Sequence, residues 1–283
     1  MELFPSINGL SRYLRAMNAE NIKEWKIELT YKVDFIRGTL EPLIFVFPYV
    51  LFAMSLMGGR TSSVLEELTG VADGVTYTII GYIFMGFLDT AVWGMGFALR
   101  KEQWYGTLES VFVAPVPRWV YVMGMALHSI IHQGIILFFQ IAVVYVLFGI
   151  ILDIQGILPV LILIALMLIS LMGLGLMVSG LALIFKEGWI VSEVFYSLIT
   201  IVTPIAYPLA VLPPLIQTVS KTMPTTYAIT GIRHFLVAET MNFTLWEAYS
   251  RLILIGVCWI ALGLIIFSIV DRKVRREGTL AEY

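Results

Sequence analysis

The sequence predicts an all-α integral membrane protein with six transmembrane helices. Of its 283 residues, 59% are hydrophobic and only 13% are charged, whereas a soluble domain carries about 25% charged residues. This composition leaves too little polar surface to cover a water-soluble globule, which excludes a soluble enzyme or nucleic-acid binder. The apolar stretches are long and do not alternate in polarity, so they predict helices and not the strands of a membrane barrel.

Six apolar stretches approach or exceed the length of about 20 residues that a helix needs to cross a bilayer. They cover residues 40–57, 75–99, 119–152, 157–185, 189–212 and 248–270. The third and fourth are longer than a perpendicular crossing requires, so we expect them to tilt or to extend beyond the lipid.

The basic residues predict the orientation of these spans. Fourteen of the 18 Lys and Arg residues fall before the first span, after the sixth, or in the loops after the second and fourth. They are Arg12, Arg15, Lys23, Lys26, Lys32, Arg37, Arg100, Lys101, Arg118, Lys186, Arg272, Lys273, Arg275 and Arg276. Because basic loops stay in the cytoplasm, we expect a cell-membrane protein with both termini cytoplasmic. We divide it into a cytoplasmic segment (1–39), a transmembrane domain (40–271) and a cytoplasmic tail (272–283).

The N-terminal segment has the pattern of an amphipathic helix. Apolar residues between Leu10 and Leu29 are interleaved with basic ones, and Trp25 stands beside Lys26. This pattern favours a helix in the cytoplasmic membrane interface, with its basic side chains near anionic headgroups. A plain solvated helix is the alternative.

The loop between the second and third spans predicts a short cytoplasmic helix. Thr107 can cap its start, and Pro115 and Pro117 end it. Leu108, Val111 and Phe112 then share one face, flanked by Glu102 and Glu109. We expect this apolar stripe to be exposed and to require a groove on another molecule.

Two motifs resemble the ABC-2-type permeases, the membrane subunits of one class of ABC exporters. The first is the run from Glu102 to Pro115, which contains Gly106-Thr107-Leu108-Glu109. In that family this loop is a coupling helix that docks on the nucleotide-binding subunit. The resemblance implies that Glu102, Gly106, Thr107, Leu108, Glu109, Val111, Phe112 and Pro115 make this contact. Trp104-Tyr105 departs from the family, in which this place is usually polar or charged.

The second motif lies in the segment that follows the fifth span. Residues 203–233, with Pro204, Pro208, Pro213, Pro224 and Arg233, are similar to the family's short helices that re-enter the outer leaflet before the last span. Independently, a continuous helix would not tolerate these prolines. A structural kink is the alternative, and it explains Pro204 and Pro208.

The chain contains no P-loop motif that would hold ATP phosphates. If the protein is an ABC exporter, ATP and Mg are therefore bound by a separate subunit, and this chain binds no cofactor and is not itself an enzyme. The resemblance implies three partners, namely an ABC ATPase subunit, a second permease copy and the lipid bilayer. No nucleic acid is expected.

Ionisable groups inside the spans are candidates for a translocation pathway. Asp89 lies near the middle of the second span, and His128 and His132 are one helical turn apart on the third. Asp89 could equally be a structural hydrogen-bonded acid. We expect the histidines to form an interhelical or cavity-facing pair and not a metal site. Gln133 is a further pathway candidate, although Gln133, Gln140 and Ser170 favour helix–helix contacts.

The leading hypothesis is a permease subunit of an ABC exporter for a lipid-like, drug-like or lipid-linked polysaccharide substrate. The alternative is a proton-coupled secondary transporter or channel that uses Asp89 and the histidines of the third span. Its characteristic inverted repeats are not evident in the sequence. A third hypothesis, an intramembrane enzyme, is disfavoured because the polar groups are few and scattered.

Overall fold

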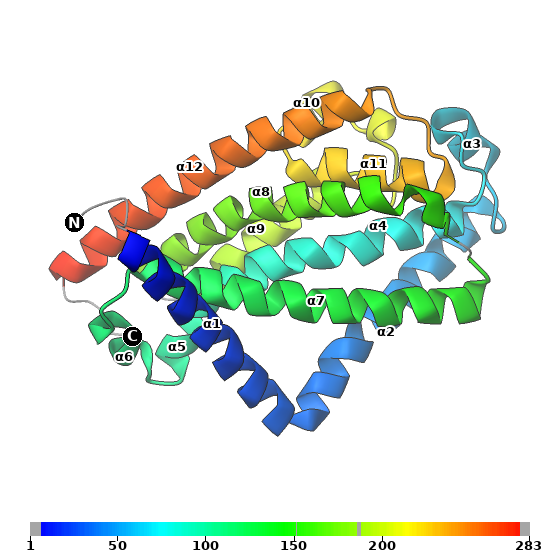
Figure 1. Ribbon diagram of the computed structural model, residues 1–283. Helices are drawn as coiled ribbons and strands as arrows, with labels where there is room; N and C mark the ends of the chain where they lie inside the picture. Colours follow the sequence, from blue (N-terminus) through cyan, green and yellow to red (C-terminus); the bar gives the residue numbers. More distant parts are fainter. Residues whose placement is uncertain (1–6, 151, 186–187, 278–283) are drawn as a thin grey trace.

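The computed structural model describes residues 7–150, 152–185 and 188–277. Lys186 of the predicted cytoplasmic link and the outermost residues of both cytoplasmic segments lie outside these ranges. Within the described ranges every regular element is a helix. Four long helices run side by side along the molecule (Figure 1). They are α4 (Gly74–Asp89), continued by the π-helix η1 (Thr90–Met95), then α7 (Arg118–Phe148), α8 (Ile157–Ile184) and α12 (Leu245–Glu277).

These four helices are long and apolar enough to cross a membrane, over Gly74–Met95, Arg118–Phe148, Ile157–Ile184 and Leu245–Val274. They correspond to the predicted second, third, fourth and sixth spans. The predicted first and fifth spans fall on shorter apolar helices, Ile44–Met57 within α2 (Lys32–Met57) and α9 (Gly188–Val202). The total of six crossings therefore stays a prediction.

The fifth apolar stretch, residues 189–212, is not one continuous helix, as the prolines within it predict. Helix α9 ends at Val202, because Pro204 and Pro208 cannot donate the backbone hydrogen bonds that would continue it. The chain continues through η3 (Leu209–Val211), α10 (Pro214–Ser220) and α11 (Pro224–Val237). Both α10 and α11 have proline at their first position, where a missing N–H costs nothing. The depth of this segment in a membrane stays a prediction.

Arg233 holds this broken segment together. Its side chain is fully buried and donates hydrogen bonds to the carbonyl oxygens of Pro204, over 2.8 Å, and Ile205. The guanidinium carbon lies 3.6 Å from the centroid of the Tyr77 ring on α4. Gly81 permits the close approach, because a Cβ at that position would lie 2.0 Å from the Ile205 oxygen. Helix α11 therefore anchors the end of α9 to α4.

Helices α8 and α12 pack at very short range. A Cβ on Gly173 would lie 2.3 Å from the backbone of Trp259, so the backbones touch without intervening side chains. The Ser170 hydroxyl donates to the Leu252 carbonyl across the interface over 3.2 Å. The helix–helix contact expected for Ser170 is thus confirmed.

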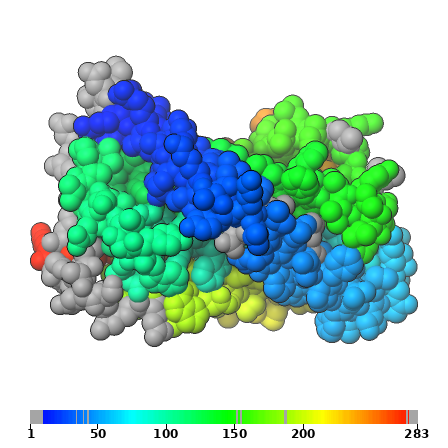
Figure 2. All heavy atoms as spheres, turned by 90° about the horizontal axis from the view of Figure 1, so that it is seen from below, coloured from blue at the N-terminus to red at the C-terminus, as the bar shows by residue number. Residues whose placement is uncertain are grey.

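The N-terminal helices lie outside the four-helix layer. Helix α1 (Ile7–Thr30) and α2 form a V whose first arm packs along the beginning of α7 (Figure 1). Figure 2 shows the two helices crossing one face of the molecule. Helices α5 (Ala98–Trp104) and α6 (Leu108–Val113) lie at the end where α1 begins and α12 ends. Helix α3 (Ser63–Thr69) lies at the opposite end, and η2 (Ile154–Gly156) precedes α8.

Candidate functional site

Helices α5 and α6 form a helical hairpin, of which α6 is the short helix predicted between the second and third spans. Gly106 makes the turn at φ +70°, a conformation that glycine adopts without strain. Thr107 stands at the start of α6, but its hydroxyl donates to the Glu102 carboxylate over 2.5 Å. The predicted capping of α6 by this hydroxyl is therefore wrong. Helix α6 ends at Val113, shortly before Pro115.

The face of α6 that we expected to be exposed is turned inward. Leu108 is only 4% exposed, and Val111 and Phe112 are half-buried against the cluster that contains Leu99 and Val122. A helix of six residues is not stable alone, so it buries its apolar stripe against its own chain. The prediction of an exposed stripe at Leu108, Val111 and Phe112 is wrong.

A different set of side chains is presented to solvent at this end. Trp104, Tyr105 and Val113 are 64%, 65% and 85% exposed, and Glu109 is exposed beside them. We call these four residues the α5–α6 surface. The Trp104-Tyr105 pair, which departs from the permease pattern, is thus the largest apolar feature of this surface.

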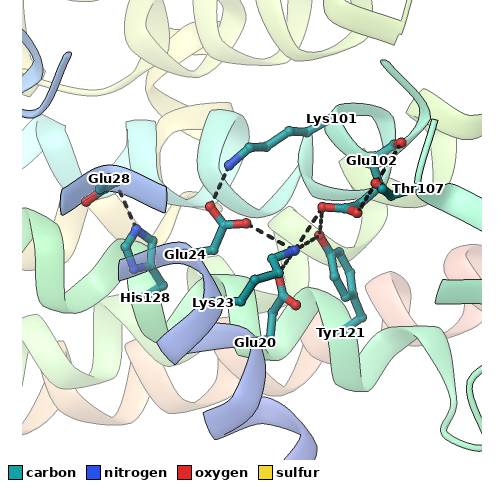
Figure 3. Close-up of polar contacts among 9 residues, drawn as sticks. All are labelled: Glu20, Lys23, Glu24, Glu28, Lys101, Glu102, Thr107, Tyr121 and His128. Atoms are coloured by element: carbon teal, nitrogen blue, oxygen red, sulfur yellow. Dashed lines mark hydrogen bonds and ion pairs between the residues drawn. The ribbon is translucent and has the colours of Figure 1, made fainter. Parts of the chain in front are cut away.

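A half-buried polar cluster joins α1 to α5, next to the start of α6 (Figure 3). Its acidic groups are Glu20 and Glu24 of α1 and Glu102 of α5, and one oxygen of each lies within 4.8 Å of the others. The Lys23 ammonium lies among them, 2.6, 3.3 and 2.9 Å from Glu20, Glu24 and Glu102. We call these four residues, together with Lys101 and Tyr121, the α1–α5 polar cluster. Lys101 pairs with Glu24 over 2.5 Å, and the Tyr121 hydroxyl donates to Glu102 over 2.8 Å.

The surroundings set the charge state of this cluster. Burial raises the pKa of Glu102, but hydrogen bonds from Thr107, Lys23 and Tyr121 outweigh it, and the net shift is downward. Glu20 differs, because burial outweighs its hydrogen bond with Lys23 and raises its pKa. Lys23 occupies the position that a metal ion would take among the three carboxylates. The cluster therefore carries its own cation and acts as an ionic clamp between α1 and α5.

The two histidines of α7 join the same helix α1. His128 Nε2 lies 3.1 Å from a Glu28 oxygen, and His132 Nδ1 lies 3.9 Å from that same oxygen. The Trp25 ring packs edge-on against both imidazoles. The expected interhelical pair is confirmed. Neither histidine lines the cavity that holds Asp89, so their place as pathway residues is not supported.

Asp89 and Gln133 do share a cavity, which has a volume of about 470 Å³. It lies between α2, α4, α7 and α9, and its polar lining residues are Glu41, Tyr49, Tyr82, Asp89, Gln133, Gln140, Tyr196 and Thr200. Asp89 ends α4 where the π-helix η1 begins, and π-turns of this kind often occur at functional sites. The Tyr196 hydroxyl of α9 is its hydrogen-bond partner.

Gln133 and Gln140 are buried side chains, 7% and 4% exposed. Gln133 packs against Gly86 of α4, where an added Cβ would lie 2.1 Å from its amide nitrogen, so it makes the helix–helix contact expected of it. Each glutamine also has a buried amide atom without a hydrogen-bond partner among the described residues, and both line the cavity. The placement of Gln133 beside Asp89 agrees with a pathway role as well.

Sequence reasoning missed the tyrosines of the cavity and the acidic residues of α1. Tyr49, Tyr82 and Tyr196 come from three helices, and tyrosines in apolar spans are usually assigned to the membrane interface. Glu20, Glu24 and Glu28 recur once per helical turn in a segment that is otherwise basic. That spacing was the available signal of an inward acidic face.

Apolar helices of membrane-crossing length, a cavity among them and a helical hairpin at one end are features expected of a membrane transport component. The chain belongs to the ABC-2 type transporter family, whose model matches residues 20–237. A search of curated proteins found no match. The protein is therefore a multi-pass membrane protein of an ABC transporter. Members of this family are generally not catalytic themselves and typically pair with an ABC ATPase subunit.

Proposed function

We propose that the protein is the permease subunit of an ATP-driven exporter in the cell membrane. It crosses the membrane six times with both termini in the cytoplasm, and it moves a lipid-like, drug-like or lipid-linked polysaccharide substrate outward from the cytoplasm or inner leaflet. ATP and Mg bind to a separate ATPase subunit. Two copies of the permease form the pathway, as symmetric assemblies of this kind require.

The observation that carries the proposal is the α5–α6 surface. Its exposed Trp104, Tyr105 and Val113 are large apolar groups of the kind that dominate protein interfaces, and Glu109 adds a charge at the rim. The surface has a rigid support, because the α1–α5 polar cluster and the buried Leu108 hold it in place. We propose that the ATPase subunit docks here.

The same arrangement offers a route for motion. Helix α5 follows directly from η1 and α4, and α4 lines the cavity with Asp89. The α1–α5 polar cluster joins α5 to α1, which leads into α2 on the opposite wall of the cavity. A displacement of α5 by the ATPase would therefore act on both walls.

The proton-coupled alternative has no observation in its favour. A relay would need Asp89 and the histidines to face one space, but His128 and His132 lie against Glu28 on α1. We therefore propose the ATP-driven mechanism alone.

A pull-down tests the proposal. The purified protein is incubated with its candidate ABC ATPase, and Trp104→Asp, Val113→Asp and Glu109→Arg are compared with wild type. We expect the replacement of either apolar residue, in Trp104→Asp or Val113→Asp, to weaken ATPase binding by about tenfold or more. The matched control is Glu67→Arg on α3, an exposed residue at the opposite end, which should bind normally. Unchanged binding in all three variants, each shown to be folded, would refute docking at this surface.

A further inference from the structure

The charged residues described in the lining of the cavity are all acidic. Its ionisable acids are Asp89 and Glu41, and the described residues that line it include no Lys, Arg or His. Glu41 is neutralised by Arg37, whose guanidinium lies 2.7 Å away on the same helix. Asp89 has the Tyr196 hydroxyl as its partner and no described cation beside it. No described group of the protein stabilises the ionised form of Asp89 by charge, so a cation that enters the cavity would supply the missing counter-charge.

Aromatic faces accompany this carboxylate. Tyr49 and Tyr82 stack with ring centroids 4.5 Å apart, and Tyr196 on α9 also lines the cavity. The faces of aromatic rings attract cations through their quadrupole. A carboxylate among tyrosine rings is therefore suited to a positively charged organic group and repels an anionic one.

Buried polar atoms without a hydrogen-bond partner also line the cavity. Gln133, Gln140 and Thr200 each leave a buried polar atom without a partner, and all three line the cavity. Leaving such a group unsatisfied costs about 1–3 kcal/mol, so their common placement at one cavity needs an explanation. A bound molecule with hydrogen-bonding groups would satisfy them.

We propose that this cavity binds an amphipathic organic cation, with its charged centre between Asp89 and the tyrosine rings. The apolar body of the ligand would lie along Phe45, Val46, Ile83 and Val144, which also line the cavity. The volume of about 470 Å³ falls within the range of drug-sized sites. That the bound cation is a transport substrate rests on the proposed function. Among the proposed substrates, the anionic lipids that carry phosphate groups are disfavoured.

Two ions of the same shape and opposite charge test the proposal. The full-length protein in nanodiscs of zwitterionic lipid is titrated with tetraphenylphosphonium and with tetraphenylborate. We expect saturable binding of the cation only. Asp89→Asn should weaken it about tenfold or more, because it removes the charge that faces the ligand. The matched control is Asp153→Asn, which removes an exposed carboxylate outside the cavity and should leave binding unchanged.

A second pair of variants keeps the test independent of the folding of Asp89→Asn. Tyr49 is 48% exposed, so its replacement should be tolerated. Tyr49→Leu should weaken cation binding about three- to tenfold, whereas Tyr49→Phe, which keeps the ring, should bind like wild type. Equal binding of both ions, or cation binding that ignores both Asp89 and Tyr49, would overturn the proposal.

The pull-down separates this proposal from the proposed function. Cation binding that depends on Asp89 in a protein that captures no ATPase would leave the site standing and remove the exporter assignment. Capture of the ATPase by a protein that does not bind the cation selectively would support the exporter assignment and overturn the cation site.

Discussion

Lys23 on α1 donates a hydrogen bond to Glu102 on α5 over 2.9 Å, and so joins two helices through residues that are 79 positions apart in the chain. The same ammonium lies 2.6 Å from Glu20. Because Glu102 also accepts from Thr107 at the start of α6, the contact connects the N-terminal helix to the α5–α6 surface. Helices α1, α5 and α6 should therefore move as one body.

Removal of the Lys23 charge should destabilise this body. Lys23→Met leaves three carboxylates close together without their central cation, and should lower the free energy of unfolding by about 1–3 kcal/mol. This loss of stability is smaller than for a fully buried ion pair, because the Lys23 side chain is 36% exposed. Thermal unfolding in detergent measures the change. Addition of Glu102→Gln should restore part of the loss, and Lys26→Met on the exposed face of α1 should have little effect.

Acid should weaken the same cluster. The folded pKa of Glu102 is below its ordinary value of 4.5, so its stabilisation is fully present above pH 4.5 and is lost as the pH falls through the folded pKa. Glu20 has a raised pKa and acts in the opposite direction, because its ionised form is disfavoured in the folded state. Unfolding midpoints between about pH 6 and 3.5 should fall less in Glu102→Gln than in wild type, and more in Glu20→Gln. Parallel curves for the three proteins would contradict this assignment.

Two glycines should respond in opposite ways to the same replacement. In Gly81→Ala the new Cβ would meet the Ile205 oxygen at 2.0 Å and the Arg233 side chain at 2.2 Å. We expect a loss of about 1–3 kcal/mol, because the backbone of the broken segment must shift. A Cβ added at Gly134 would meet no atom within 4 Å, so Gly134→Ala in the middle of α7 should stabilise by up to about 1 kcal/mol. Equal effects in unfolding experiments would show that α11 does not pack on α4 as described.

Leu108 and Val113 should separate folding from partner binding. Leu108 is 4% exposed, so Leu108→Ala should cost about 2–4 kcal/mol of stability. Val113 is 85% exposed, and Val113→Ala should change stability by less than about 0.5 kcal/mol. If the ATPase docks on the α5–α6 surface, Val113→Ala should nevertheless weaken the pull-down. If Val113→Ala is destabilised, or if Leu108→Ala is as stable as wild type, the assignment of Leu108 to the buried face of α6 and Val113 to the exposed face is wrong.

The sequence predicted the helical membrane class, the short helix that ends before Pro115 and the interruption at Pro204, because apolar length and proline act locally. It did not predict which face of α6 is buried. Over six residues the helical period fixes that Leu108, Val111 and Phe112 share a face, but not whether that face points inward.

The contacts of the candidate sites could not be predicted for a related reason. Lys23 meets Glu102 across 79 residues, and the cavity combines Tyr49, Asp89 and Tyr196 from three helices. Sequence patterns assign such residues to a helix and a depth, whereas the pairing of helices decides what they touch. The π-helix after Asp89 depends in the same way on tertiary contacts, among them the bond of 3.4 Å from Ser192 to the Val92 carbonyl.

The number of membrane crossings depends on α9, whose 15 residues span about 22 Å, less than the hydrocarbon thickness of about 30 Å. If the segment after Val202 completes the fifth crossing, α10 lies on the external side with α3. Single cysteines at Glu67, Glu109 and Thr218 in a Cys258→Ser background test this with an impermeant maleimide on intact cells. Glu67→Cys and Thr218→Cys should react from outside, and Glu109→Cys only after permeabilisation. Reaction of Thr218→Cys from the cytoplasmic side alone would show that α9 turns back before it crosses, and would reduce the count below six.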